Sequence, residues 1–111
     1  MDSLDKKYYK ISEVAEILNI PATTLRFWES RFTVIRPRRN SGGTRYYTAN
    51  DIETIRLVHY LVKQRGLKLD AAQEQVRNNR AGVEKRYEVV KRLLEIRRRL
   101  TDIMKALDSR R

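Results

Sequence analysis

The chain has 111 residues, which is enough for one small domain with an appended element. It carries 25 Lys and Arg residues against 14 Asp and Glu residues, so its formal net charge is +11. An excess of this size favours a polyanionic partner, either nucleic acid or an anionic membrane surface. The alternative is a solvated basic surface that only aids solubility.

Composition also excludes several kinds of site. The sequence has no cysteine, which excludes disulfides, thiolate metal ligands and a cysteine nucleophile. Its single histidine, His59, has no cluster of ligands near it in the sequence, so we expect no metal site and no cofactor. No apolar run approaches the roughly 20 residues that span a bilayer, and no signal segment opens the chain. We therefore expect a cytoplasmic protein that is not an enzyme, because a phosphate-binding loop and a nucleophile–base pair are also missing.

The segment 11–32, ISEVAEILNIPATTLRFWESRF, predicts two short helices with a tight turn between them. Apolar residues recur at three- and four-residue spacing from Ile11 to Leu18, and Ser12 is a candidate N-cap for this first helix. Asn19 ends the pattern and is a candidate cap for the second helix, with Pro21 near its first turn.

The second helix of this pair is predicted to have one buried face and one exposed face. Leu25, Trp28 and Phe32 form its apolar stripe. Its opposite face carries Thr23, Thr24, Arg26 and Phe27. A second helix that presents hydroxyls and a guanidinium outward matches the helix-turn-helix plan, although a simple helical hairpin remains the alternative.

The next segment predicts a β-hairpin. Two short β-prone stretches flank an Asn-Ser-Gly-Gly tip at residues 40–43. The hairpin carries four arginines and no acidic residue, at positions Arg36, Arg38, Arg39 and Arg45. We interpret it as a wing that lies along phosphates, because guanidinium groups bind phosphate bidentately and glycine permits close backbone approach. The alternative is a solvated, charged hairpin.

A third helix is predicted from Thr48 to Gly66. Thr48 and Asp51 form a capping box at its start, and Gly66 stops it. His59 lies on or beside its apolar face, where we expect a partly buried structural role. The last turn carries two cations, Lys63 and Arg65.

The remainder predicts a short helix over 67–76, a break at 77–82 and one long helix over 84–107. Apolar residues on the long helix are spaced 4, 3, 4, 3, 4 and form a heptad seam: Val89, Leu93, Ile96, Leu100, Ile103 and Leu107. A second copy of the chain is the simplest partner that could cover this seam, although the helix could instead fold back on its own domain. We therefore expect a DNA-binding domain at 1–80 and a dimerisation helix at 81–111.

This order of elements resembles the MerR family of bacterial transcription regulators. The resemblance rests on three stretches: Leu25-Arg26-Phe27-Trp28-Glu29, Gly42-Gly43-Thr44-Arg45-Tyr46-Tyr47, and Thr48 with Asp51 and Ile52. It covers about residues 8–76. The fold that it implies is mainly α, a winged helix-turn-helix with a small β-hairpin wing and a C-terminal coiled-coil helix.

The resemblance also implies a function and a set of contacts. A homodimer with antiparallel long helices would bind double-stranded DNA at a pseudo-palindromic promoter site, with RNA polymerase as a further partner and no membrane involved. The DNA-binding positions that it implies are Thr23, Thr24, Arg26, Phe27, Arg38, Arg39, Gly43, Arg45, Tyr46, Lys63 and Arg65.

Two features depart from the family pattern. Phe27 replaces the commoner tyrosine, so a hydroxyl contact to phosphate is lost at that position. The sequence has no cysteine and ends soon after the long helix, so we expect no metal or redox sensor; either an effector domain lies beyond Arg111 or the protein regulates without one. Two rival functions would show some of the same sequence features: an excisionase-like or architectural winged-helix protein of a mobile element, and a coiled-coil adaptor that binds an acidic protein.

Overall fold

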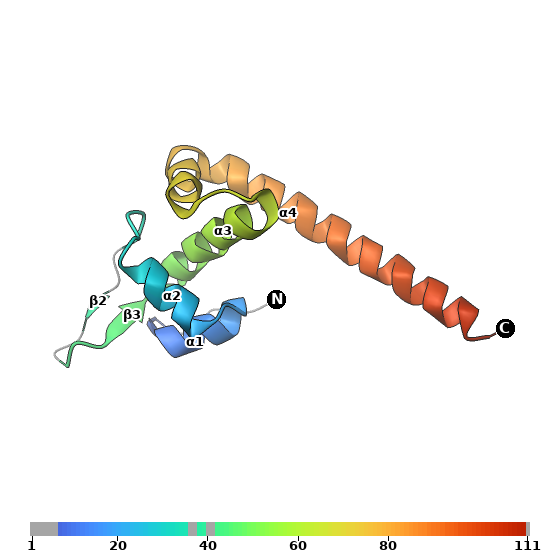
Figure 1. Ribbon diagram of the computed structural model, residues 1–111, viewed down its shortest axis with the longest axis horizontal. Coiled ribbons are helices and arrows are strands. Elements are labelled where there is room, and N and C mark those ends of the chain that lie inside the picture. Colours follow the sequence, from blue (N-terminus) through green and yellow to red (C-terminus); the bar gives the residue numbers. More distant parts are fainter. Residues whose placement is uncertain (1–6, 36–37, 40–41, 111) are drawn as a thin grey trace. The chain divides into compact units, whose positions relative to one another are not determined.

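The computed structural model describes residues 7–35, 38–39 and 42–110 (Figure 1). The chain divides into two compact units, which we call the N-terminal unit, Met1–Asn79, and the C-terminal unit, Arg80–Arg111. The fold is mainly helical, as predicted. Its helices are α1 (Ile11–Leu18), α2 (Ala22–Glu29), α3 (Ala49–Arg65) and α4 (Leu69–Asp108).

The turn between α1 and α2 differs from the prediction. Asn19 is the C-cap of α1, in the left-handed conformation with φ 54°, rather than a cap for the second helix. Its backbone N–H donates to the carbonyls of Ala15 and Glu16 at the end of α1. Asparagine is one of the few residues that adopt this conformation at low cost, which explains why the stripe ends there. Pro21 occupies the N-cap position of α2.

The start of α1 is also set differently from the prediction. Lys10, rather than Ser12, precedes the helix, and its backbone N–H donates to the Glu13 carboxylate at 3.1 Å. Lys10 is extended because it belongs to a strand, β1 (Tyr9–Lys10), which the sequence did not predict.

This strand joins the predicted hairpin and makes a three-stranded antiparallel sheet in the order β1-β3-β2. The hairpin strands are β2 (Arg38–Arg39) and β3 (Arg45–Tyr47). In the turn between them, Gly43 has φ 83°, which favours glycine. The predicted tip residues Asn40 and Ser41, like Arg36 before the hairpin, lie outside the described residues.

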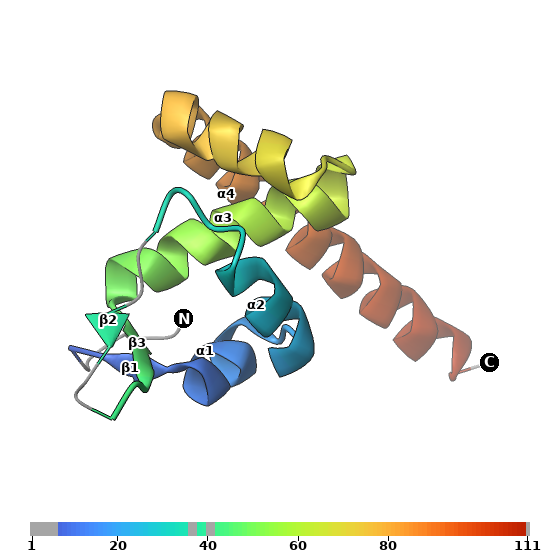
Figure 2. The same cartoon turned by 60° about the vertical axis from the view of Figure 1, so that its left-hand side comes forward.

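The core of the N-terminal unit forms where α1, α2 and α3 meet, and Figure 2 shows these helices and the sheet gathered together. The most deeply buried side chains include Val14, Leu25, Ile52, Ile55 and Val58. Each aliphatic side chain of this size contributes about 1.5–3 kcal/mol when it is removed from water. This core fixes the orientation of α2 in the N-terminal unit.

The ends of α3 confirm the predicted signals. Thr48 Oγ1 accepts the Asp51 N–H at 3.1 Å, and the Asp51 carboxylate accepts the Thr48 N–H at 3.0 Å. Gly66 ends the helix in the left-handed conformation, with φ 69°.

Helix α4 joins the two helices that the sequence predicts separately. Helical backbone runs through the predicted break at 77–82 except at Asn79, whose φ of −150° and ψ of 56° are not helical. This non-helical residue is a kink between two helices inside the predicted break, and the boundary between the two units also lies there. Arg80 and Glu84, which pair at 3.0 Å, support the helix where it resumes, and Gly82 costs only about 1 kcal/mol. No helix in the described part of the chain is long and apolar enough to cross a membrane.

Candidate nucleic-acid interface

Helix α2 separates its buried residues from its exposed ones as the sequence predicts, but it ends at Glu29, so Phe32 of the predicted apolar stripe lies beyond the helix. Leu25 and Trp28 are buried in the core of the N-terminal unit. Thr23, Arg26 and Phe27 are exposed, whereas Thr24 is half-buried. Positions three and four apart share a helix face, so the exposed residues present one polar and aromatic surface.

Arg31, which the sequence did not predict as part of the site, adds a cation to this exposed surface. The guanidinium of Arg31 lies 4.7 Å from the centre of the Phe27 ring, and the Phe27 side chain is 57% exposed. A cation–π contact at an exposed site contributes about 0.5–1 kcal/mol. An aromatic residue followed four positions later by arginine at the end of a helix is a signal that could have identified Arg31.

Glu29, in the last turn of α2, connects this helix to the wing. Its Oε1 is 2.8 Å from Nη1 of Arg45, and its Oε2 accepts a hydrogen bond from the Tyr47 hydroxyl. Arg45 and Tyr47 are two residues apart on β3, so both side chains point to the same face of the strand. Because the Glu29 side chain is only 8% exposed, two residues of the wing are held to α2 by one shielded carboxylate.

Electrostatic interactions in this cluster determine the protonation state of the Tyr47 hydroxyl. Burial and the neighbouring Glu29 carboxylate both raise the pKa of Tyr47, so its hydroxyl stays protonated and donates. In the sequence, Glu29 is notable only as part of a family motif. An acidic residue at a helix C-terminus is disfavoured by the helix dipole, and this conflict is the signal that Glu29 has a specific partner.

The structure separates two wing residues that the sequence analysis grouped together. Tyr46 lies between Arg45 and Tyr47 and points to the opposite face of β3, where its ring meets Tyr8 edge-on with centroids 6.4 Å apart. In the backbone register, Arg38 is opposite Tyr46 and Arg39 is opposite Arg45. The wing therefore has an inner face toward α2 and an outer face.

A buried glutamine fixes the segment that leaves α2. Gln73, on the first part of α4, is only 1% exposed. Its Oε1 accepts the Thr33 N–H at 2.6 Å, and its Nε2 donates to the Arg31 carbonyl at 2.9 Å. Arg77 donates to the Thr33 hydroxyl from the next turn of the same helix. The sequence did not predict these long-range contacts of Gln73 and Arg77, because no local pattern links positions about forty residues apart.

The last turn of α3 carries the remaining predicted contacts. Lys63 and Arg65 are both exposed there. His59, one turn earlier, is half-buried with its ring 6.0 Å from that of Trp28. Burial lowers the pKa of His59, and the positive charge of Lys63 lowers it further. No group of His, Asp or Glu side chains in the described residues could hold a metal ion.

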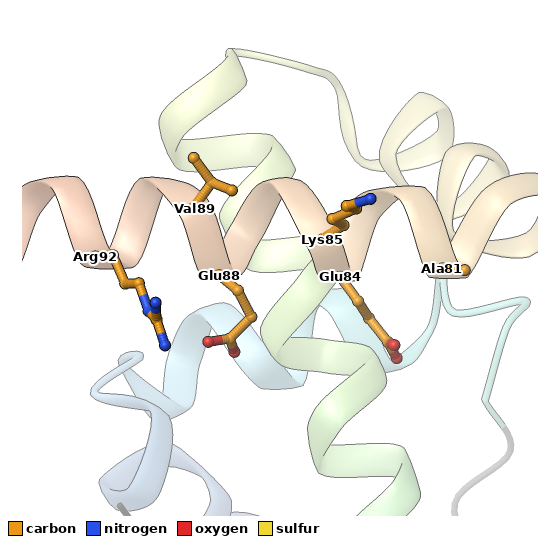
Figure 3. A pocket seen from close by; sticks show the side chains of 6 residues that line it. All are labelled: Ala81, Glu84, Lys85, Glu88, Val89 and Arg92. Carbon is orange, nitrogen blue, oxygen red and sulfur yellow. The ribbon is translucent and has the colours of Figure 1, made fainter.

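The C-terminal unit presents an apolar seam on an otherwise charged helix. All six predicted seam residues are exposed, with exposed fractions between 53% and 60%. Figure 3 shows Glu84, Glu88 and Arg92 projecting from one side of the helix, whereas Val89 of the seam projects from another. The apolar and charged faces are therefore distinct.

Comparison with known proteins identifies the family. The family model described as MerR HTH family regulatory protein matches residues 9–79, which include α1, α2, the sheet and α3. The chain belongs to this family. Among its relatives, a Streptomyces coelicolor protein assigned as heat shock protein HspR is 30% identical over 105 residues, covering 95% of this chain and 62% of that protein. The transcriptional repressor CarA of Myxococcus xanthus is 35% identical over 69 residues, covering 61% of this chain and 24% of CarA.

Solved structures support the same fold. The MerR family regulator HiNmlR, which lacks the sensor domain and was crystallised bound to promoter DNA, superposes with a TM-score of 0.56 at 23% identity. The match covers 91% of this chain and 79% of HiNmlR. The chain thus shares the fold of the family, and it spans less than two thirds of the length of the relatives HspR and CarA.

Proposed function

We propose that this chain is a MerR-type transcriptional regulator that binds promoter DNA as a homodimer. One observation carries the proposal: the exposed face of α2, with Thr23, Arg26 and Phe27, is joined through buried Glu29 to a basic wing. Specific DNA binding requires contacts that read base edges and contacts that hold phosphates. A recognition helix supplies the first kind and an adjacent β-ribbon supplies the second.

The predicted residues divide between contacts to bases or sugars and contacts to phosphates in this proposal. Arg26 reads a base edge in the major groove, since guanidinium donates bidentately to guanine. Thr23, Thr24 and Phe27 contact neighbouring bases or sugars. The other proposed contacts are to phosphates, from Arg38, Arg39, Gly43, Arg45, Tyr46, Lys63 and Arg65.

The exposed seam of the C-terminal unit supports pairing with a second copy. Six large apolar side chains on one helix face are costly to leave in water, and a twofold pair covers both seams at once. Two α2 helices then reach two half-sites of a pseudo-palindromic promoter, where contact with RNA polymerase is the further step that we propose. A partner of this kind places the protein at the nucleoid, in the cytoplasm.

Genome-wide mapping of bound DNA, followed by binding to the recovered site, tests the proposal. If each protomer neutralises about four phosphates, the logarithm of affinity should fall with the logarithm of salt concentration at a slope of roughly −7. Arg26→Ala should cost about 1–3 kcal/mol and relax preference at one base position. A flat salt response, or a site distribution confined to recombination sites of mobile elements, would contradict the proposal.

A further inference from the structure

The outer face of the three-stranded sheet carries side chains that the proposed contacts of α2 do not use. Tyr9 and Tyr47 pair across β1 and β3 and are both buried, so they mark the inner face of the sheet. Successive residues of a strand point to opposite faces. Lys10 and Tyr46, which follow and precede these tyrosines, therefore point outward.

The register aligns one outward residue from each strand. Tyr46 of β3 pairs with Lys10 of β1 on one side and with Arg38 of β2 on the other. Residues paired directly across strands have their side chains on the same face. Strands are about 4.8 Å apart, so the backbones of Lys10 and Arg38 are about 10 Å apart, with Tyr46 between them. Both cations are exposed and Tyr46 is half-buried.

Lys7 and Tyr8, which precede β1, extend this row. The Tyr8 ring meets the Tyr46 ring edge-on, with 6.4 Å between centroids. Nζ of Lys7 lies 5.5 Å from the centre of the Tyr8 ring. These contacts restrict the aromatic rings, so less side-chain entropy is lost when a ligand binds beside them.

The chemistry of the row fits the backbone of duplex DNA. Lysine, arginine and tyrosine side chains are standard donors to phosphate oxygens. Phosphates recur about every 3.4 Å along the axis of each strand, so a row about 10 Å long suits a repeating backbone better than one small anion. Single-stranded DNA would need open ring faces for stacking, but Lys7 lies over the ring of Tyr8.

We propose that the row Lys10–Tyr46–Arg38 is a phosphate-binding surface through which the N-terminal strand β1 joins the DNA interface. The inference rests on the proposed function, because it adds Lys10 of β1 to the phosphate contacts already proposed for Arg38 and Tyr46 in the same complex. It assigns a role to Lys10, which the sequence analysis left out of the interface.

The test measures how duplex affinity depends on salt for the full chain and a duplex of random sequence. Lys10→Gln should reduce the steepness of the log–log salt dependence by about 0.9, the value for one lost phosphate contact. Lys10→Arg should restore it. Lys68→Gln is the matched control, because Lys68 is an exposed lysine of the N-terminal unit that lies between α3 and α4. Circular dichroism should show the same helix content for all variants.

The possible outcomes separate this inference from the proposed function. If the parent chain binds the duplex and Lys10→Gln has the same salt dependence as Lys68→Gln, the inference is overturned and the proposed function stands. Tighter binding of Lys10→Gln to duplex would also overturn the inference. If the parent chain does not bind duplex at any salt concentration, both proposals fail together.

Discussion

The two units differ in how far their regularly spaced apolar residues are buried within one chain. In the N-terminal unit, the large apolar side chains Leu25, Ile52 and Ile55 are almost inaccessible to water. In the C-terminal unit, isoleucine and leucine recur with similar regularity, yet Ile96 and Leu100 are 53% and 56% exposed. The first pattern completes a core within one chain, whereas the second is a surface that another copy can cover. The free energy of unfolding should therefore depend on protein concentration for the C-terminal unit but not for the N-terminal unit.

The largest effect should come from the completed core. Ile55→Ala should lower the free energy of unfolding of the N-terminal unit by about 2–5 kcal/mol, because it leaves a cavity where the side chain is fully buried. Urea unfolding followed by Trp28 fluorescence measures this loss. The loss should be the same at low and high protein concentration, and a strong dependence on concentration would mean that this core is shared between copies.

The same chemical change in the exposed seam should have a different consequence. Ile96→Ala should weaken self-association by about 1–2 kcal/mol per protomer, because the side chain is covered only in the proposed dimer. Sedimentation equilibrium measures the association, and Trp28 fluorescence should show the N-terminal unit unfolding as before. Arg98→Ala, on the same helix but off the seam, is the control. Equal effects of the two substitutions would argue against the seam as the interface.

A smaller effect should come from the link between α2 and the wing. Glu29→Gln removes the charge that holds Arg45 but keeps an acceptor for Tyr47. We expect duplex affinity to fall about tenfold, or about 1.4 kcal/mol, although the protein becomes more positive. Filter binding or fluorescence anisotropy at fixed salt measures this change.

Glu16→Gln provides the control for Glu29→Gln. Glu16 is exposed on α1, so its substitution removes the same charge without releasing Arg45. We expect that variant to bind duplex slightly more tightly, because long-range attraction to phosphate grows. If Glu29→Gln also binds more tightly, then Glu29 merely neutralises Arg45 and does not position it for DNA.

What the sequence predicts well here depends on neighbours along the chain. The capping box of Thr48 and Asp51, the stop at Gly66 and the two faces of α2 each follow from residues a few positions apart. The cluster around Glu29 and the long-range contacts of Gln73 join residues 16 to 42 positions apart. Side-chain polarity alone does not say which distant partner such a residue will find. Strand β1 was missed for the same reason, since two residues form a strand only because β3 lies beside them.

The smallest expected effect is a pH response confined to the N-terminal unit, which contains the only histidine. The pKa of His59 is lowered from its ordinary value of 6.5, by burial first and by Lys63 second. At and below this pH the unfolded chain therefore binds more protons than the folded chain. The free energy of unfolding is thus unaffected by His59 above pH 6.5, and it declines as the pH falls through that value toward the lower pKa of the folded state. His59→Gln should remove this part of the decline, measured as the difference between the urea midpoints of the two proteins between about pH 5 and 8.

Self-association through the seam should show no matching step in this range, because the C-terminal unit has no histidine. A step in association that His59→Gln abolishes would instead mean that the two units are energetically coupled.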